Sequence, residues 1–279
     1  MNFCSRTAGG EALAGTAVRG AAYVFLPVAK RYWRGSELNL SWASRAELDA
    51  IRAARKVGLV TRLYNPAGEE EEVLTHVPPG AGDPEGLDAF LSLFAPRWPR
   101  RAAAGRRFAV CTHGTRDRCC AKWGFAVFRE ALELYEAGAS PFAPIECSHL
   151  GGDRFAATGV VFPSGGMYAH LDSADLAALL QAEAEGSLLP AHYRGCVFEP
   201  QLVQIVRAGL AREGLVVDAR TPIAVEWDGE GPATARAGEA RFAVELKRTE
   251  VAFFGSCTDL ERGRRSTVQR TVFLAARRL

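Results

Sequence analysis

The chain of 279 residues is long enough to bury one or two hydrophobic cores, and 48% of its residues are hydrophobic. Its 34 lysines and arginines nearly balance its 32 acidic residues, and a net charge of +2 gives no electrostatic case for nucleic-acid binding. The longest apolar run near the N-terminus, residues 21–28, is too short to span a bilayer and lacks the flanks of a signal peptide. We therefore expect a cytoplasmic protein with neither a membrane nor a nucleic acid as partner.

The first region, residues 1–104, predicts the order strand, helix, strand, strand, helix. The predicted strands are residues 21–28, 58–64 and 71–77, and the predicted helices are residues 44–57 and 83–95. Ser44, with Glu47 three residues later, forms a capping box that starts the first helix. A turn is predicted over residues 65–68, where Asn, Pro and Gly occur together.

The second region, residues 105–213, follows a basic, proline-containing linker at residues 96–107. Its predicted elements are strands at residues 107–112 and 141–148, a hairpin over 157–171, and helices at 120–137 and 173–186. Ser173 is the expected N-cap of the last helix. Strand, helix, strand, hairpin, helix is the order of a thioredoxin-like α/β layer, so the two regions predict two similar α/β units in tandem.

The last region, residues 214–279, follows a predicted helix at residues 199–214. Strands are predicted at residues 222–229, 240–248, 251–257 and 266–279. They are expected to form a small antiparallel sheet without a catalytic cluster, which makes this region a C-terminal β-rich extension.

The chain has seven cysteines, and their number and context need an explanation. An odd number of cysteines in a long chain without an export signal argues against a disulfide framework. Four of the seven fall between residues 111 and 147. In a reducing compartment, clustered cysteines with nearby histidines indicate metal binding or redox chemistry.

Two short segments carry this cluster: "CTHGTRDRCC" at residues 111–120 and "ECSHLGGDRF" at residues 146–155. Both follow predicted strands, and sites in open α/β sheets form at the C-terminal ends of strands. Cys111 ends one strand and Cys120 starts a helix, so the loop between them can direct both thiolates at one centre. His149 follows the next strand. Two thiolates and an imidazole are the beginning of a soft-metal site.

The surroundings of this centre favour negative charge. Basic side chains near the predicted helix start stabilise thiolates, and these are Arg116, Arg118 and Lys122. Gly151 and Gly152 allow backbone N–H groups to approach an anionic centre closely. We expect Arg116 and Asp117 to form a local ion pair that shapes the loop.

The paired stretches "CTHGTRDRCCAKWG" and "ECSHLGGDRFAATGVVFP" resemble the sucrase/ferredoxin-like family, which belongs with the thioredoxin-like [2Fe-2S] ferredoxins. The resemblance is strongest over residues 108–205. It implies an electron-transfer protein with one [2Fe-2S] cluster and a redox partner protein, either a reductase or an electron acceptor. It implies an electron carrier more than a self-contained enzyme. The word "sucrase" in the family's name is historical and is given no weight as an activity.

The resemblance also implies the cluster ligands, which the family takes from a C-x8-C and an H-x3-H segment. Cys111 and Cys120 match the first segment, and His149 matches the first histidine. Asp153 stands at the second histidine position and is the expected fourth ligand. Cys147 is the alternative, because it lies two residues before His149 on a predicted strand and would point to the same side; its thiolate is also the better iron ligand.

Other residues of these types are given structural roles. The family pattern makes His113 a hydrogen-bond donor to a cluster sulfur, although its Cys-x-His spacing is also that of Rieske-type ligation. Cys119 is interpreted as a neighbour of the site, since it cannot easily share an iron with Cys120. Cys4, Cys196 and Cys257 are interpreted as core or loop thiols.

Spacing alone leaves two other function classes open. A structural zinc protein could use the same residues, since Cys and His suit tetrahedral zinc equally well. A thiol-disulfide oxidoreductase of thioredoxin type is the other class, but the chain has no Cys-x-x-Cys motif. The family resemblance favours iron.

Overall fold

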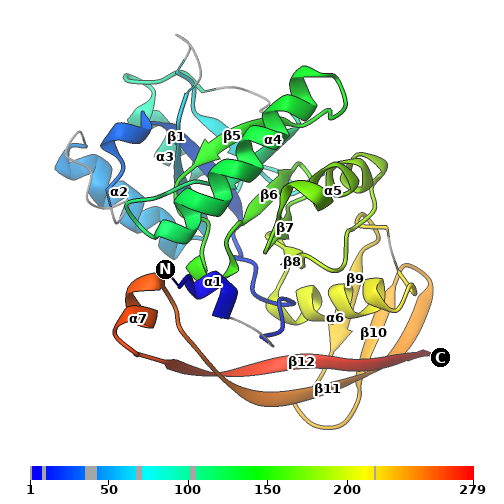
Figure 1. Ribbon diagram of the computed structural model, residues 1–279. Helices are drawn as coiled ribbons and strands as arrows, with labels where there is room; N and C mark the ends of the chain where they lie inside the picture. The colour runs from blue at the N-terminus through cyan, green and yellow to red at the C-terminus, as the bar shows by residue number, and fades with distance from the viewer. Residues whose placement is uncertain (1, 8–10, 35–42, 67–70, 101–104, 217) are drawn as a thin grey trace.

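The computed structural model describes residues 2–7, 11–34, 43–66, 71–100, 105–216 and 218–279. These residues form a mixed α/β protein with a curled eight-stranded mixed sheet and a separate four-stranded antiparallel sheet (Figure 1). Among the described helices, none is long and apolar enough to cross a membrane.

The large sheet has the strand order β3-β1-β2-β5-β4-β6-β7-β8. Its strands are β1 (Ala22–Pro27), β2 (Leu59–Tyr64), β3 (Leu74–His76), β4 (Arg107–Cys111), β5 (Ala143–Cys147), β6 (Gly159–Phe162), β7 (Gly166–Tyr168) and β8 (Tyr193–Cys196). The α-helices are α1 (Cys4–Thr7), α2 (Arg45–Lys56), α3 (Leu87–Phe94), α4 (Phe125–Glu136), α5 (Ser173–Glu185), α6 (Gln201–Arg212) and α7 (Cys257–Glu261). Three short helical turns are η1 (Lys30–Tyr32), η2 (Cys120–Gly124), which is a π-helix, and η3 (Asp153–Phe155).

The two halves of this sheet have the same strand pairing. In the first half, β1 pairs in parallel with β2 and antiparallel with β3. In the second half, β4 pairs in parallel with β5 and antiparallel with β6, and β7 then continues antiparallel. The halves join where β2 meets β5 antiparallel, at Tyr64 and Cys147. The strand arrangement is therefore repeated, with one continuous sheet across both copies.

Alternating side chains divide the interior into cores on the two faces of the sheet. In β4, Phe108 and Val110 pack in the core that includes residues of α4 and α5, whereas Ala109 and Cys111 face the opposite core. This second core also contains Tyr23 of β1 and most of the cysteines. The curl of the sheet thus brings both halves around the sulfur-bearing side chains.

Of the two N-caps predicted from the sequence, the one of α2 is confirmed and the one of α5 is wrong. The capping box is confirmed, since the Ser44 hydroxyl accepts from the Glu47 N–H and the Glu47 carboxylate accepts from the Ser44 N–H. The expected cap at Ser173 is wrong, because Asp172 is the N-cap of α5. The Asp172 carboxylate accepts from two first-turn N–H groups, which Ser173 cannot do from inside the helix.

The C-terminal sheet has the order β12-β11-β10-β9. Its strands are β9 (Ile223–Glu226), β10 (Ala233–Ala237), β11 (Ala240–Phe253) and β12 (Ser266–Arg278). The expected antiparallel sheet is present, but the predicted strands at 240–248 and 251–257 are mostly one strand. The polar stretch between them stays paired with β12, as Thr249 opposite Arg270 shows.

The long β11–β12 hairpin extends past α6 and carries α7 at its far end, next to α1 at the N-terminus (Figure 1). Cys257 therefore starts a helix instead of ending a strand. The chain's two terminal regions meet at this point.

Two expected connections fall partly outside the described residues. The turn over 65–68 includes residues 67–68, and the linker at 96–107 includes residues 101–104, which are not described. The start of that linker is part of the fold, because Trp98 is buried and its indole N–H donates to Glu71.

Candidate metal centre

The first metal-binding candidate is built where two parallel strands end together. β4 and β5 end in register at Cys111 and Cys147, so the loops that follow them start at the same edge of the sheet. The chain then returns to β4 through η2. A Cβ at Gly124 would lie 2.0 Å from the Cys111 carbonyl oxygen, so only glycine allows this close packing of η2 on the strand. That approach places Cys120, at the start of η2, next to Cys111.

Three of the predicted ligands come together. The ligand atoms of Cys111, Cys120 and His149 all lie within 4.8 Å of one another. Asp153 completes the arrangement, with its Oδ1 3.7 Å from Cys120 Sγ and 3.1 Å from His149 Nδ1. We call these four residues the Cys111 group. Their combination of two thiols, an imidazole and a carboxylate can bind a soft metal.

The alternative ligand, Cys147, lies beside this group. It is opposite Cys111 on the neighbouring strand and in the same core. Like Asp153, it lies outside the compact set of donor atoms that Cys111, Cys120 and His149 form among the described side chains. The argument from strand alternation does not apply, because β5 ends at Cys147 and His149 lies in the following loop.

The pKa values of the two thiols of the Cys111 group are shifted in opposite directions. A hydrogen bond from Cys120 is the main cause that lowers the pKa of Cys111 well below its usual value, and contacts with the His149 imidazole and the His113 backbone N–H add to it. The Cys111 thiolate is in turn the main cause that raises the pKa of Cys120 well above its usual value, followed by burial. Both shifts arise mainly from the contact between the two sulfurs.

The imidazole and the carboxylate both have raised pKa values. Burial raises the pKa of Asp153 to about 6, although His149 and Arg116 oppose the shift. Burial alone would lower the pKa of His149, but the hydrogen bond and charge of Cys111, together with Asp153, raise it overall. His149 keeps 19% of its side chain exposed, whereas Asp153 keeps 4%.

The neighbouring residues named from the sequence lie around this group. His113 Nδ1 accepts from the His149 backbone N–H at 3.2 Å, so Nε2 is the nitrogen of the neutral ring that carries the proton. Gly151 and Gly152 have positive φ angles of 103° and 81°, and the Gly151 carbonyl accepts from Arg194 at 2.9 Å. These contacts hold the loop that carries the imidazole and the carboxylate.

The expected ion pair between Arg116 and Asp117 stays a prediction, and both residues make contacts with other groups. Arg116 Nε lies 3.7 Å from Asp153 Oδ2, so the guanidinium faces the Cys111 group. The Asp117 carboxylate accepts from the backbone N–H groups of Cys119 at 2.8 Å and Cys257 at 2.7 Å. The Asp117 carboxylate thus holds two backbone N–H groups, and the Arg116 guanidinium lies near the second buried carboxylate, that of Asp153.

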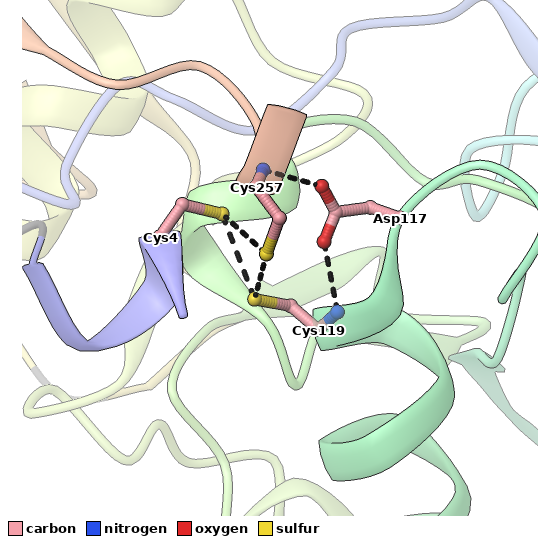
Figure 2. A group of neighbouring side chains, drawn as sticks. All are labelled: Cys4, Asp117, Cys119 and Cys257. Atoms are coloured by element: carbon pink, nitrogen blue, oxygen red, sulfur yellow. Dashed lines mark hydrogen bonds between the residues drawn. The ribbon is translucent and has the colours of Figure 1, made fainter. Parts of the chain in front are cut away.

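A second group of donors, missed in the sequence, consists of Cys4, Asp117, Cys119 and Cys257 (Figure 2). We call it the Cys4 group. All four residues are buried, and their ligand atoms lie within 4.8 Å of one another. Cys4 and Cys257 are core thiols, as interpreted from the sequence, and the structure adds that they and Cys119 lie together. Cys196 lies apart in β8, where its thiol donates to the Ser164 carbonyl.

The contacts within the Cys4 group shift the pKa values of its thiols in different directions. The pKa of Cys119 is lowered to about 6, mainly by a hydrogen bond from the Cys4 thiol and then by donors on Ser5. The same contact raises the pKa of Cys4, and burial raises that of Cys257 to about 11. Both groups of donors can hold a metal ion.

The comparisons with known proteins bear on the first group. A family model described as sucrase/ferredoxin-like matches residues 23–195, which is more than half of the chain. This match includes all four residues of the Cys111 group and extends through the N-terminal half. No curated protein and no solved structure matches the chain.

Proposed function

The chain belongs to the sucrase/ferredoxin-like family, and we propose that it is an electron-transfer protein that binds one [2Fe-2S] cluster. The ligands in this proposal are Cys111, Cys120, His149 and Asp153. The observation that carries it is the convergence of two buried thiols and a half-buried imidazole at the family's motif positions. A bound [2Fe-2S] cluster supplies one-electron transfer.

The donor chemistry fits such a cluster. Thiolates and imidazoles are the ligands of [2Fe-2S] centres, and a Rieske-type centre combines two of each. Asp153 is supported as the fourth ligand by its contacts with both Cys120 and His149. Cys147 is the alternative, supported by its position opposite Cys111.

The exposure of the ligands supports a direction for electron transfer. Cys111, Cys120 and Asp153 are 2%, 2% and 3% exposed, and His149 is the ligand that reaches the surface. We propose that a redox partner protein, a reductase or an electron acceptor, docks over the His149 edge. Arg116 is beside it with 47% of its side chain exposed, which offers a cation to that partner.

The cellular setting and the class of protein follow from the same proposal. None of the seven cysteines, all of which the structure describes, forms a disulfide. This fits the reducing, cytoplasmic location that we propose, and the proposed partner is a redox protein and not a nucleic acid or a membrane. We propose an electron carrier that depends on its partner to complete a reaction.

We also propose that the two halves of the large sheet are thioredoxin-like units. Residues 1–104 form the first, residues 105–213 form the second and carry the cluster, and residues 214–279 are an extension. The support is the repeated strand pairing around β1 and β4.

Anaerobic purification followed by absorption spectroscopy and iron and sulfide assays tests the function. We expect a reddish-brown protein with about two irons and two sulfides per chain, and a paramagnetic signal after dithionite reduction. A colourless protein whose Cys111 group holds zinc would overturn the proposal. Zinc at that group is identified by its loss in Cys111→Ser.

A further inference from the structure

The Cys4 group lies next to the Cys111 group, and the two are separated by the Cys119–Cys120 peptide bond. It joins three parts of the chain: α1, the loop before η2, and the start of α7 (Figure 2). We propose that Cys4, Cys119, Cys257 and Asp117 hold a structural zinc ion. This proposal is independent of the proposed function, because it uses a different set of donors.

The sulfur positions fit one metal ion. Cys4 Sγ and Cys119 Sγ are 3.5 Å apart, Cys119 Sγ and Cys257 Sγ are 3.2 Å apart, and Cys257 Sγ and Cys4 Sγ are 3.7 Å apart. Tetrahedral zinc with Zn–S bonds of about 2.3 Å separates its sulfurs by about 3.8 Å. The thiols therefore need only small shifts to surround a single ion. A disulfide would use two of them and leave the third without a role.

The fourth donor selects among soft metals. Asp117 has a carboxylate oxygen within the same 4.8 Å set, and carboxylate oxygen is an ordinary zinc ligand. Three thiolates alone would also suit Cu(I), but a hard oxygen donor in a tetrahedral set favours zinc. Four protein ligands close the coordination sphere, and all four are at most 5% exposed. Closed sites of this kind are structural.

Groups around the sulfurs support thiolates at these positions. The Ser5 hydroxyl donates to Cys119 Sγ at 3.3 Å. The Asp117 carboxylate, through its two backbone contacts, sets the positions of Cys119 and Cys257. Such outer contacts orient metal ligands and stabilise their charge.

The position of the site in the chain indicates what the ion does. Cys4 and Cys257 lie outside the stretch that matches the family, residues 23–195, and only Cys119 and Asp117 lie within it. The site therefore attaches the two terminal regions to the loop that carries the proposed cluster ligands. Zinc at Cys119 also fixes the backbone next to Cys120. Binding replaces the protons of the thiols and links metal content to folding.

Metal analysis of the anaerobically purified full chain tests this proposal. After an EDTA wash we expect about one zinc per chain. Cys4→Ser and Cys257→Ser should lose this zinc and keep their iron, whereas Cys111→Ser should lose iron and keep zinc. Cys196→Ser is the matched control and should keep both metals. The two sites can therefore fail separately.

A second measurement covers the case in which a cysteine variant fails to fold. Apo protein of the Cys111→Ser variant is titrated with Co²⁺ alone, and we expect sulfur-to-cobalt charge-transfer and tetrahedral ligand-field bands. Absence of zinc together with absence of these bands would overturn the proposal. A Cys119–Cys257 disulfide in the anaerobic protein, detected by mass spectrometry, would also overturn it. So would iron that is kept in Cys111→Ser and lost in Cys257→Ser, since iron would then occupy this site.

Discussion

The Cys111 group and the Cys4 group meet at adjacent residues, Cys120 and Cys119, but the fold assembles them differently. The Cys111 group lies at the ends of two parallel neighbouring strands, within a chain segment that matches the family. The Cys4 group needs contacts across 115 and 138 residues of chain. The first group belongs to the common framework of the family, and the second exists only because the termini fold onto that framework.

The comparison also shows how the loop at residues 111–120 can contribute a cysteine to each group while the two groups stay separate. Cys119 is directed toward Cys4 and Cys257, and Cys120 toward Cys111 and Asp153. Consecutive residues at the start of a helix point about 100° apart, so neighbouring cysteines need not share a metal. The predictions below test this separation.

The largest effect on metal content is expected from replacing Cys119 and Cys120 by serine, one at a time. Cys120→Ser should remove most of the iron, because it deletes a thiolate for which the Cys111 group has no equally placed substitute. Cys111→Ser should do the same, whereas Cys119→Ser should keep its iron and lose zinc. Absorption spectra and metal assays check this. If Cys119→Ser bleaches the protein and Cys120→Ser keeps a normal spectrum, the assignment of the loop is wrong by one residue.

A smaller effect on stability is expected from Asp117→Ala. The change leaves the buried backbone N–H groups of Cys119 and Cys257 without their acceptor. We expect a loss of about 2–6 kcal/mol in the free energy of unfolding, because each of the two buried N–H groups left unsatisfied costs about 1–3 kcal/mol. Chemical denaturation of the metal-free protein measures it. Asp259→Ala, at the N-terminus of α7, is the control. An equal loss of stability in that variant would mean that the hydrogen bonds of Asp117 to Cys119 and Cys257 make no special contribution.

A buried carboxyl outside the Cys111 group and the Cys4 group, that of Glu183, makes the stability of the fold depend on pH. This effect must be separated from any pH dependence of the two groups. Burial raises the pKa of Glu183 from 4.5 to about 7, although its bond from the Tyr168 hydroxyl opposes the shift. Because the folded state holds this proton more tightly, its contribution is full below pH 4.5 and is lost as pH rises to about 7. The loss amounts to about 3 kcal/mol at most.

Glu183→Gln should therefore stabilise the protein above pH 7 by about 1–2 kcal/mol, since the neutral amide avoids burying a charge but needs partners for its N–H groups. Denaturation curves at pH 5 and pH 8 check this, with the exposed Glu185→Gln on the same helix as control. A gain of the same size at pH 5 would show that the charge of Glu183 is not the cause.

The smallest structural change is expected from Asp153→His, which should keep the proposed cluster. Replacing a carboxylate by a neutral imidazole removes one negative charge, so the reduction potential should rise. Voltammetry measures the shift, and Cys147→Ser should leave the potential close to that of the native protein. If Cys147→Ser loses the cluster and Asp153→His leaves the potential unchanged, the fourth ligand is Cys147.

Much of the Cys111 group could be predicted from the sequence. Cys111 and His149 follow strands that were recognisable as apolar runs, and parallel strands end at the same edge of a sheet. Cys120 lies at a helix start, and its spacing from Cys111 matches the family motif. Local patterning is sufficient here because the neighbouring strands and a single loop fix all three positions.

The fold was predictable to the same degree. Strands and helices of both halves follow from hydrophobic periodicity and from caps such as Ser44 with Glu47. The length of β11 was not, because its polar middle is stabilised by pairing with β12 and not by burial. Periodicity reports which side chains are buried, and it says little about a strand that is held mainly by its backbone.

The Cys4 group depended on tertiary structure alone. Cys4 and Cys257 have no neighbouring cysteine or histidine in the sequence, and each could be an ordinary core thiol. The sequence by itself determined the elements and the residues at the strand ends, since these depend on local propensity and side-chain pattern. Only the folding of α1 and the β11–β12 hairpin onto the loop brought the three thiols together, because a contact across more than a hundred residues depends on the packing of whole elements.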